Sequence, residues 1–311
     1  MGRLFTAAGT GGARADKLQD SRRRRAALRR MNILALETST ETLSVALCAD
    51  GACRSRDEAG GARASQRLLP LCRELLAEAG LDLRNVGLIG MGAGPGAFTG
   101  LRTAASVAQG LAFGLDIAVA PVDTLLAQAE TAFPSLQADG QALPAPITEA
   151  APGGVVLVVN DARMGEVYWE LAIAGASGWT ALHGPAVHPP EQAVAHWTQA
   201  LAALPEPGMA EPPLRACGNA WSEHAEALTT ALASTVCPAP WADALRRAVA
   251  AAVSCTPSAA AVARLALRMH AAGQTVGPEQ AQPIYVRDKV ALTTAEREIV
   301  GGGAGRMPNA R

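Results

Sequence analysis

One pattern occurs twice in the sequence: an apolar stretch, a short polar turn that contains a carboxylate, and a second apolar stretch. The first copy comprises Ile33–Leu36, Glu37–Thr42 and Leu43–Cys48, and the second comprises Val155–Val159, Asn160–Arg163 and Glu166–Ala174. The apolar stretches have the length and the residue types of buried strands. A strand–turn–strand unit that recurs in this way predicts two lobes built on one plan.

The segments around the two copies predict an α/β fold, with mixed sheets flanked by helices. Asp50-Gly51 is a hairpin signal, after which Ala52–Glu58 can return as a third strand. Strands and helices then alternate. Further strands are predicted at 86–91, 117–120, 214–217 and 283–287, and helices at 65–79, 101–113, 124–132, 191–204, 222–232 and 258–272.

Shifts in composition divide the chain. Residues 1–30 are rich in Gly, Ala and Arg, and we expect them to form a disordered basic extension. The first lobe is expected at 31–135 and the second at 136–257, which opens with a linker rich in Pro, Gly and Ala. Residues 258–295 are expected to supply a helix and a strand that close the lobes, and 296–311 a disordered tail.

Composition argues against several classes of protein. A net charge of −1 and an aromatic share of 4% are not typical of a chain that grips nucleic acid unaided. No apolar run reaches the roughly 18 residues that a membrane span needs. The six cysteines include no C-x-x-C pair, so we interpret them as small buried hydrophobic residues of a cytoplasmic protein.

Two segments are candidates for binding a phosphate group. The first turn offers a carboxylate, hydroxyl groups and backbone donors, which suit a metal–phosphate group. The Gly92–Gly100 loop precedes a helix whose N-terminal N–H groups favour an anion, although it lacks the Gly-Lys-Ser/Thr of a Walker A loop. A purely structural turn is the alternative for each segment. The candidate residues are Glu37, Thr38, Ser39, Gly94, Gly96, Thr99 and, in the second copy, Asp161.

The sequence has no recognisable catalytic or metal-binding pattern. None of the five histidines forms the H-x-x-x-H pair of a helical metal site, and the G-x-S-x-G turn of serine hydrolases is absent. We therefore predict no catalytic residue, no metal site and no cofactor.

The helix expected after the Gly-rich loop has small residues on all sides. Between Thr99 and Phe113 its only charged residue is Arg102. A helix that is apolar all round is normally buried all round. Its own sheet can cover one side, and the Leu-rich helix at 65–79 can cover part of the other. A second protein chain is the natural cover for the remainder, and burial within this chain is the alternative.

Four motifs, in this order, resemble the TsaB (YeaZ) family. They are Ile33–Thr40, Ser65–Pro70, Gly94–Arg102 and Asp161–Tyr168. The likeness extends from about Met31 to Val290 and includes a late match at Pro283–Arg287. The pieces Gly-Pro-Gly-x-Phe-Thr-Gly and Asp-Ala-Arg-x-Gly-Glu-Val-Tyr carry most of its specificity.

This resemblance implies the two-lobed actin/Hsp70-like fold, of the ASKHA and RNase H-like type. It also implies a non-catalytic scaffold subunit in the formation of threonylcarbamoyladenosine on tRNA, which reaches tRNA only indirectly. The implied partners are a catalytic TsaD-like subunit and an ATPase TsaE-like subunit, and self-pairing into a homodimer is left open.

The resemblance also implies which helices contact the partner. The family's pairing helices correspond to 65–79 and 99–113, and the interface residues expected on them are Leu68, Leu71, Leu75, Arg102, Ala105, Ala108 and Ala112. Glu37, Ala64 and Ala97 stand where the family usually has Asp, His and Ser, which argues against nucleotide or metal binding. Two other functions stay open at this point: an autonomous Mg-ATP-dependent phosphotransferase that uses Glu37 and Asp161, and a metallopeptidase.

Overall fold

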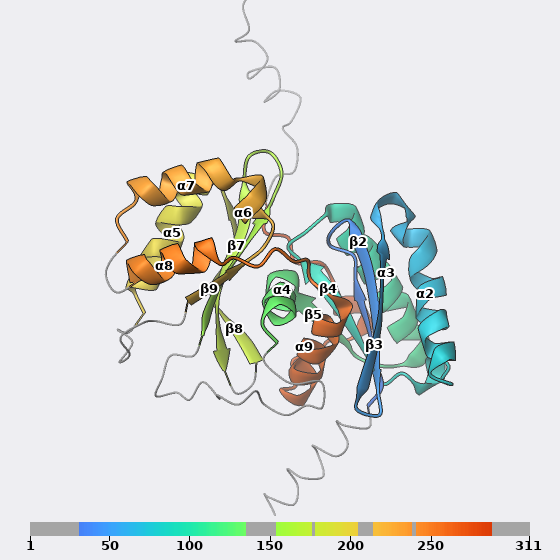
Figure 1. Cartoon of the computed structure of the whole chain (residues 1–311). Helices are drawn as coiled ribbons and strands as arrows, with labels where there is room; N and C mark the ends of the chain where they lie inside the picture. The colour runs from blue at the N-terminus through green and yellow to red at the C-terminus, as the bar shows by residue number, and fades with distance from the viewer. Residues whose placement is uncertain (1–30, 135–153, 176–177, 205–213, 238–240, 288–311) are drawn as a thin grey trace, which may run out of the picture.

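The computed structural model of the chain describes residues 31–134, 154–175, 178–204, 214–237 and 241–287. The predicted extension at 1–30, nearly all of the linker and the tail at 296–311 lie outside the described residues. Within them, two β-sheets form two lobes, each with its own helices (Figure 1). None of the described helices is both long and apolar enough to cross a membrane.

The sheet of the first lobe has the strand order β3-β2-β1-β4-β5. Its strands are β1 (Ile33–Glu37), β2 (Thr42–Ala49), β3 (Ala52–Ala59), β4 (Leu88–Gly94) and β5 (Val119–Asp123). β1, β2 and β3 are antiparallel, whereas β4 and β5 run parallel to β1. Asp50 and Gly51 both have positive φ, as the predicted tight hairpin between β2 and β3 requires.

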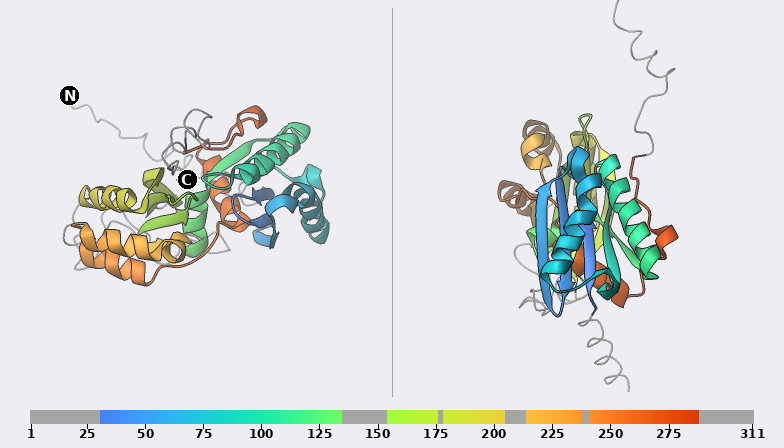
Figure 2. Two further views of the ribbon diagram at one scale, coloured as in Figure 1. Left: turned by 90° about the horizontal axis from the view of Figure 1, so that it is seen from above. Right: turned by 90° about the vertical axis from the view of Figure 1, so that its right-hand side faces the viewer.

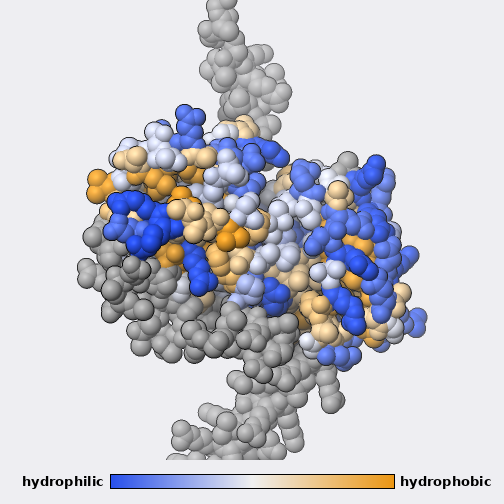
Figure 3. All heavy atoms as spheres, viewed as in Figure 1, coloured by the Kyte–Doolittle hydropathy of each residue, from blue (hydrophilic) through white to orange (hydrophobic). Residues whose placement is uncertain are grey.

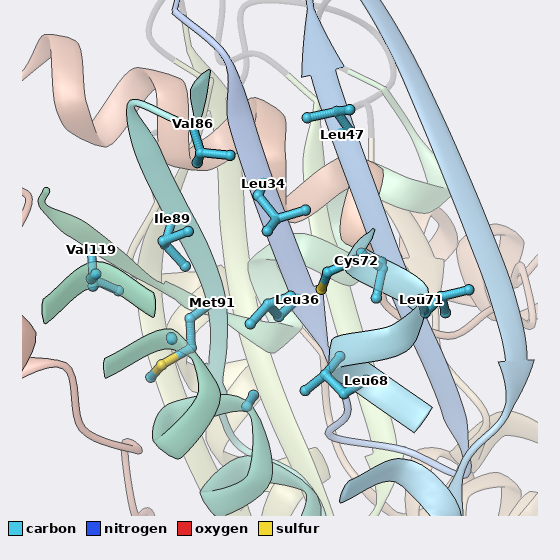
Figure 4. Packing of buried hydrophobic residues seen from close by; sticks show 14 of the residues in the cluster. Leu34, Leu36, Leu47, Leu68, Leu71, Cys72, Val86, Ile89, Met91 and Val119 are labelled. Atoms are coloured by element: carbon cyan, nitrogen blue, oxygen red, sulfur yellow. The ribbon is translucent and has the colours of Figure 1, made fainter. Parts of the chain in front are cut away.

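Helices cover both faces of this sheet. The apolar side chains of β1 point alternately to one face and to the other, so both faces must be buried. Leu34 and Leu36 face α2 (Ala64–Glu78) and α3 (Phe98–Leu115), whereas Ile33 and Ala35 face α9 (Ala259–Ala271). Figure 4 shows the first of these two cores.

The sheet of the second lobe has the order β8-β7-β6-β9, which matches the order β3-β2-β1-β4 of the first. Its strands are β6 (Val155–Asp161), β7 (Val167–Gly175), β8 (Gly178–His188) and β9 (Leu214–Cys217). β6 is antiparallel to β7 and parallel to β9. The predicted recurrence of one structural plan is therefore confirmed.

The helices of the second lobe pack mainly on one face of its sheet. They are α5 (Pro190–Ala202), α6 (Ala220–Glu223), α7 (Ala225–Ser234) and α8 (Trp241–Ala250). The opposite face packs on α4 (Thr124–Ala132), which also contacts β4, β5 and α9. This helix therefore lies between the two sheets (Figure 1).

Two local predictions were wrong, and two elements were not predicted. The predicted strand at 283–287 is absent from this described segment. Its backbone makes one hydrogen bond to β4, from the N–H of Ile284 to the C=O of Ala93 (2.7 Å). Pro283 has no N–H to donate to a further one. The predicted helix at 222–232 is interrupted at His224, whose backbone is not helical. β8 and α8 were not predicted, and the domain boundaries stay predictions.

Two cysteines also correct the sequence interpretation. Cys48 and Cys53 face each other in the register of β2 and β3 and form a disulfide. Directly opposed residues of an antiparallel pair come close enough for this bond, a relation that a search for C-x-x-C spacing misses. Cys72 and Cys217 are buried, as predicted.

Candidate functional site

A cleft of about 540 Å³ lies between the two lobes. The first lobe contributes the turn at 39–42 and the loop at 95–98, and the second contributes the turn at 160–164. The recurring unit therefore brings its two polar turns to one cavity. Residues 255–257 and 284–287 also line it.

Part of the predicted phosphate site reaches this cleft. Ser39, Gly96 and Asp161 line it, whereas Glu37, Thr38, Gly94 and Thr99 do not. Thr99 instead lines a groove on the outer surface of the first lobe.

The Glu37 side chain is held inside the first lobe. It is fully buried, and one carboxylate oxygen accepts the N–H of Ser39 at 2.6 Å. A Cβ at Gly92 would lie 1.9 Å from the other oxygen, so glycine at this position makes room for the side chain. Burial raises the pKa of Glu37 to about 7, because the charged form is disfavoured away from water. In this conformation Glu37 cannot bind a metal–phosphate group in the cleft.

The Gly-rich loop packs directly on the first turn. The Thr38 hydroxyl donates to the C=O of Gly100 (2.7 Å), and the N–H of Ala97 donates to the C=O of Ser39 (2.7 Å). A Cβ at Gly100 would lie 1.8 Å from the Thr38 carbonyl oxygen, so this approach requires glycine. These contacts are those expected of a structural turn.

Asp161 lines the cleft, but neighbouring groups already balance its charge. One carboxylate oxygen lies 2.9 Å from Nε2 of His224 and accepts the N–H of Arg163, and the other lies 3.3 Å from the Arg163 guanidinium. Burial alone would raise the pKa of Asp161, yet the hydrogen bonds to His224 and Arg163 lower it. Across the described ranges, no cluster of three or more His, Cys, Asp or Glu side chains is placed to hold a metal ion.

The segment at 281–287 lies along the cleft and contacts both lobes. On the first lobe, Arg102 donates a hydrogen bond to the Tyr285 hydroxyl at 3.1 Å. On the second, Arg287 forms an ion pair with Glu166. From the sequence, residues 258–295 were expected to close the lobes, but 283–287 was assigned to a strand, which the structure does not have.

A pair of carboxyl groups lies where the lobes meet. Asp123 caps α4 by accepting the N–H of Leu125 (2.7 Å), and its neighbour Glu170 of β7 is fully buried. No N–H or O–H group of the described chain donates to either oxygen of Glu170. Burial and the contact with Asp123 raise the pKa of Glu170 well above its ordinary value, and burial raises the pKa of Asp123 to about 7. The two groups therefore retain a proton near neutral pH.

We expect this pair to make the free energy of unfolding fall as the pH rises from about 5 to about 8. The ordinary pKa values are 3.8 for Asp and 4.5 for Glu, and in the folded chain the pKa of Asp123 is about 7. The folded state therefore binds more protons over this interval. The stabilisation is complete below about pH 4 and is lost as the pH passes about 7.

Glu170→Gln should reduce this pH dependence, because the amide does not ionise and only Asp123 is left to titrate. Urea denaturation at about pH 5.5 and about pH 8 measures it, and the variant should exceed the parent in stability only at the higher pH. Asp116→Asn, at an exposed carboxyl group after α3, is the matched control. Parallel profiles for Glu170→Gln and the parent would show that the pair does not share a proton.

The structure corrects the predicted partner interface. Six of its seven residues are buried within the chain itself, namely Leu68, Leu71, Leu75, Ala105, Ala108 and Ala112. They belong to the core between the first sheet and the helices α2 and α3, and Figure 4 shows Leu68 and Leu71 among the strand side chains. The sheet covers the apolar stripe of each helix, so the alternative of burial within the chain is correct for these six. Arg102 is exposed.

The outward faces of α2 and α3 lie on the side of the first lobe that faces away from the second (Figure 2, right). A groove of about 400 Å³ runs between the helices, lined by Ser65, Phe98, Thr99, Arg102, Thr103, Ser106 and Val107. Phe113, near the end of α3, is 82% exposed. Phe113 does not line the groove, but an aromatic side chain exposed to this degree on the same helix is typical of a surface that contacts another protein.

The edge of the first sheet has a different character. β3 is exposed along nearly its whole length and carries four charged residues, Arg54, Arg56, Asp57 and Glu58. Figure 3 shows mainly hydrophilic side chains over this part of the molecule. Charges on an edge strand oppose pairing with another sheet. The outer helices are therefore a better docking surface than this edge.

The two mixed sheets share the order of four corresponding strands, and their polar turns line one cleft. This arrangement defines the two-lobed actin/Hsp70-like class of proteins. Within this class, the chain is 30% identical to the tRNA threonylcarbamoyladenosine biosynthesis protein TsaB of Escherichia coli K12 over 262 residues, which cover 84% of this chain and 96% of that protein. The chain belongs to the TsaB (YeaZ) family, and the resemblance identified from its motifs is confirmed.

Further comparisons agree. TsaB of Haemophilus influenzae is 39% identical over 146 residues, which cover 47% of this chain and 56% of that protein. The structure of YeaZ from Pseudomonas aeruginosa matches with a TM-score of 0.59 and 32% identity, over 82% of this chain and 99% of that one. The family model described as TsaD, tRNA N6-adenosine threonylcarbamoyltransferase, matches residues 59–295.

Proposed function

We propose that this chain is a non-catalytic subunit of the cytoplasmic machinery that forms threonylcarbamoyladenosine on tRNA. It pairs with a catalytic TsaD-like subunit through the outward faces of α2 and α3. A TsaE-like ATPase joins the pair, and tRNA is contacted through the complex. The relatives named TsaB support the pathway, and the role within it rests on the surface described above.

The observation that carries this proposal is the groove between α2 and α3 together with the exposed Phe113. A stable interface buries about 1,600 Å² in total and centres on a few aromatic or arginine side chains. Phe98, Arg102 and Phe113 provide such side chains on one helix. The match to the transferase family model supports a partner of related fold, because two related lobes can pair through corresponding helices.

A reconstituted modification assay tests the proposal. The chain alone should not modify tRNA, and the transferase and ATPase subunits without the chain should be nearly inactive. Adding the chain should restore formation of threonylcarbamoyladenosine, measured by nucleoside analysis of the tRNA. Full activity of the other two subunits in its absence would overturn the proposed role.

The alternative of an autonomous phosphotransferase makes a different prediction for the isolated chain. Because Glu37 is buried and the charge of Asp161 is already balanced, we expect calorimetric titration with Mg-ATP to give no binding heat and no turnover. The ATPase subunit, titrated under the same conditions, is the positive control. Binding accompanied by hydrolysis in the isolated chain would favour the phosphotransferase.

A further inference from the structure

Two cysteines from separate parts of the second lobe lie beside each other, and one of them lines the cleft. Cys217 is the last residue of β9 and is fully buried. Cys255 lies in the segment between α8 and α9, is partly exposed, and lines the cleft. The backbone fixes this segment against the end of β9: the N–H of Gly218 donates to the C=O of Val253, and the N–H of Val253 donates to the C=O of Ala216, both at 3.0 Å.

The two thiols differ in reactivity. The hydrogen bond between them lowers the pKa of Cys255 and raises that of Cys217, whose burial adds to the rise. The proton therefore stays on Cys217, and Cys255 forms the thiolate first. A thiolate is the reactive form of cysteine, and a partly exposed thiolate beside a second thiol is the arrangement of redox-sensitive sites. Cys72, by contrast, has no such neighbour in the described core, and burial raises its pKa to about 12.

We propose that Cys217 and Cys255 form a dithiol site that small disulfides oxidise reversibly through the cleft. The Cys255 thiolate attacks one sulfur of a small disulfide, which forms a mixed disulfide and releases one small thiol. Cys217, after losing its proton to solvent, attacks the Cys255 sulfur and releases the second small thiol. The protein loses two electrons, and the small disulfide is reduced to two thiols.

Oxidation would restrain a hydrogen-bonded contact between the two lobes, which is centred on Gln128. The C=O of Cys255 accepts a hydrogen bond from the side chain of Gln128 in α4 (2.5 Å), and Gln128 also donates to the Asn160 side chain of β6 (3.1 Å). A disulfide between Cys255 and Cys217 would link this contact covalently to the end of β9. The site therefore couples the redox state of the surroundings to the packing at the cleft.

The test uses the full chain with Cys237→Ser, so that the tryptic peptide containing Cys217 holds one cysteine. The reduced protein is equilibrated with mixtures of oxidised and reduced glutathione, quenched with N-ethylmaleimide, and mapped by mass spectrometry. We expect a linked Cys217–Cys255 peptide that increases with the oxidised share, while Cys72 is recovered as a thiol. Cys48 and Cys53 report separately on the surface disulfide.

Two further variants decide the mechanism. Cys217→Ala should leave a glutathione adduct on Cys255 and slow its alkylation several-fold. Cys255→Ser should leave Cys217 unreacted, because Cys217 is buried. Recovery of both residues as separate thiols in fully oxidised glutathione would overturn the proposal, as would equal modification of Cys217 with and without Cys255.

Discussion

Replacing Glu130 by Gln is expected to lower the free energy of unfolding by about 3–5 kcal/mol. The Glu130 side chain on α4 is fully buried, with one oxygen 2.7 Å from Nε of Arg264 and the other 3.6 Å from Nη1 of Arg268. Both arginines belong to α9, so one carboxylate joins the helix between the sheets to the helix beneath the first sheet. Glutamine keeps the shape but removes the charge, and this leaves two guanidinium groups in a poorly hydrated site.

Denaturant unfolding followed by circular dichroism measures this loss. Glu78→Gln, which removes the charge from the exposed ion pair with Arg56, is the matched control and should leave stability unchanged within error. If Glu130→Gln unfolds at the same denaturant concentration as the parent, the ion pairs between α4 and α9 contribute no net stability.

Ser106→Arg is expected to weaken association with the TsaD-like subunit by on the order of a thousandfold. Ser106 is exposed on α3 and lines the groove between α2 and α3. A charge placed there is unpaired when a partner covers the groove, and an uncompensated buried charge costs several kcal/mol. Because the position is exposed in the single chain, the substitution should leave folding intact.

Titration calorimetry with the purified transferase subunit measures the change in Kd. Thr230→Arg introduces the same side chain at an exposed position of α7 in the second lobe, and we expect it to bind like the parent. A Ser106→Arg chain that binds as tightly as Thr230→Arg would exclude the groove from the interface.

The sequence predicted the architecture well, because alternation and strand length are local properties. The two copies of strand, turn and strand became β1–β2 and β6–β7 in equivalent places of two sheets. The bounds of β9 and α4 were also predicted, and those of α9 to within one residue at each end, since each depends on a few neighbouring residues.

The sequence could not predict which surface covers an apolar helix. The alanines at 105 and 108 are buried, as their residue type indicates, but against their own sheet and neighbouring helix. A charge at Ala108 would therefore disrupt the first lobe and would not test the interface. The pattern of apolar residues in the sequence indicates that a side chain is buried. Only the folded structure shows which residues it packs against.

Other features depend on contacts between distant segments. The direction of the Glu37 side chain follows from the space above Gly92, and the Asp123–Glu170 pair joins residues of different lobes. Cys217 and Cys255 are neighbours because the segment that contains Val253 forms a parallel bridge with the end of β9. None of these has a spacing signal, because each depends on a contact between segments that lie far apart in the sequence.

A photo-activated cross-linking residue placed at position 106 tests the central claim most directly. In an active mixture with the transferase and ATPase subunits, irradiation should join position 106 to the transferase subunit, and the same residue at position 230 should give no product with it. Cross-linking from position 230 but not from position 106, in a mixture that modifies tRNA, would contradict pairing through the outer helices.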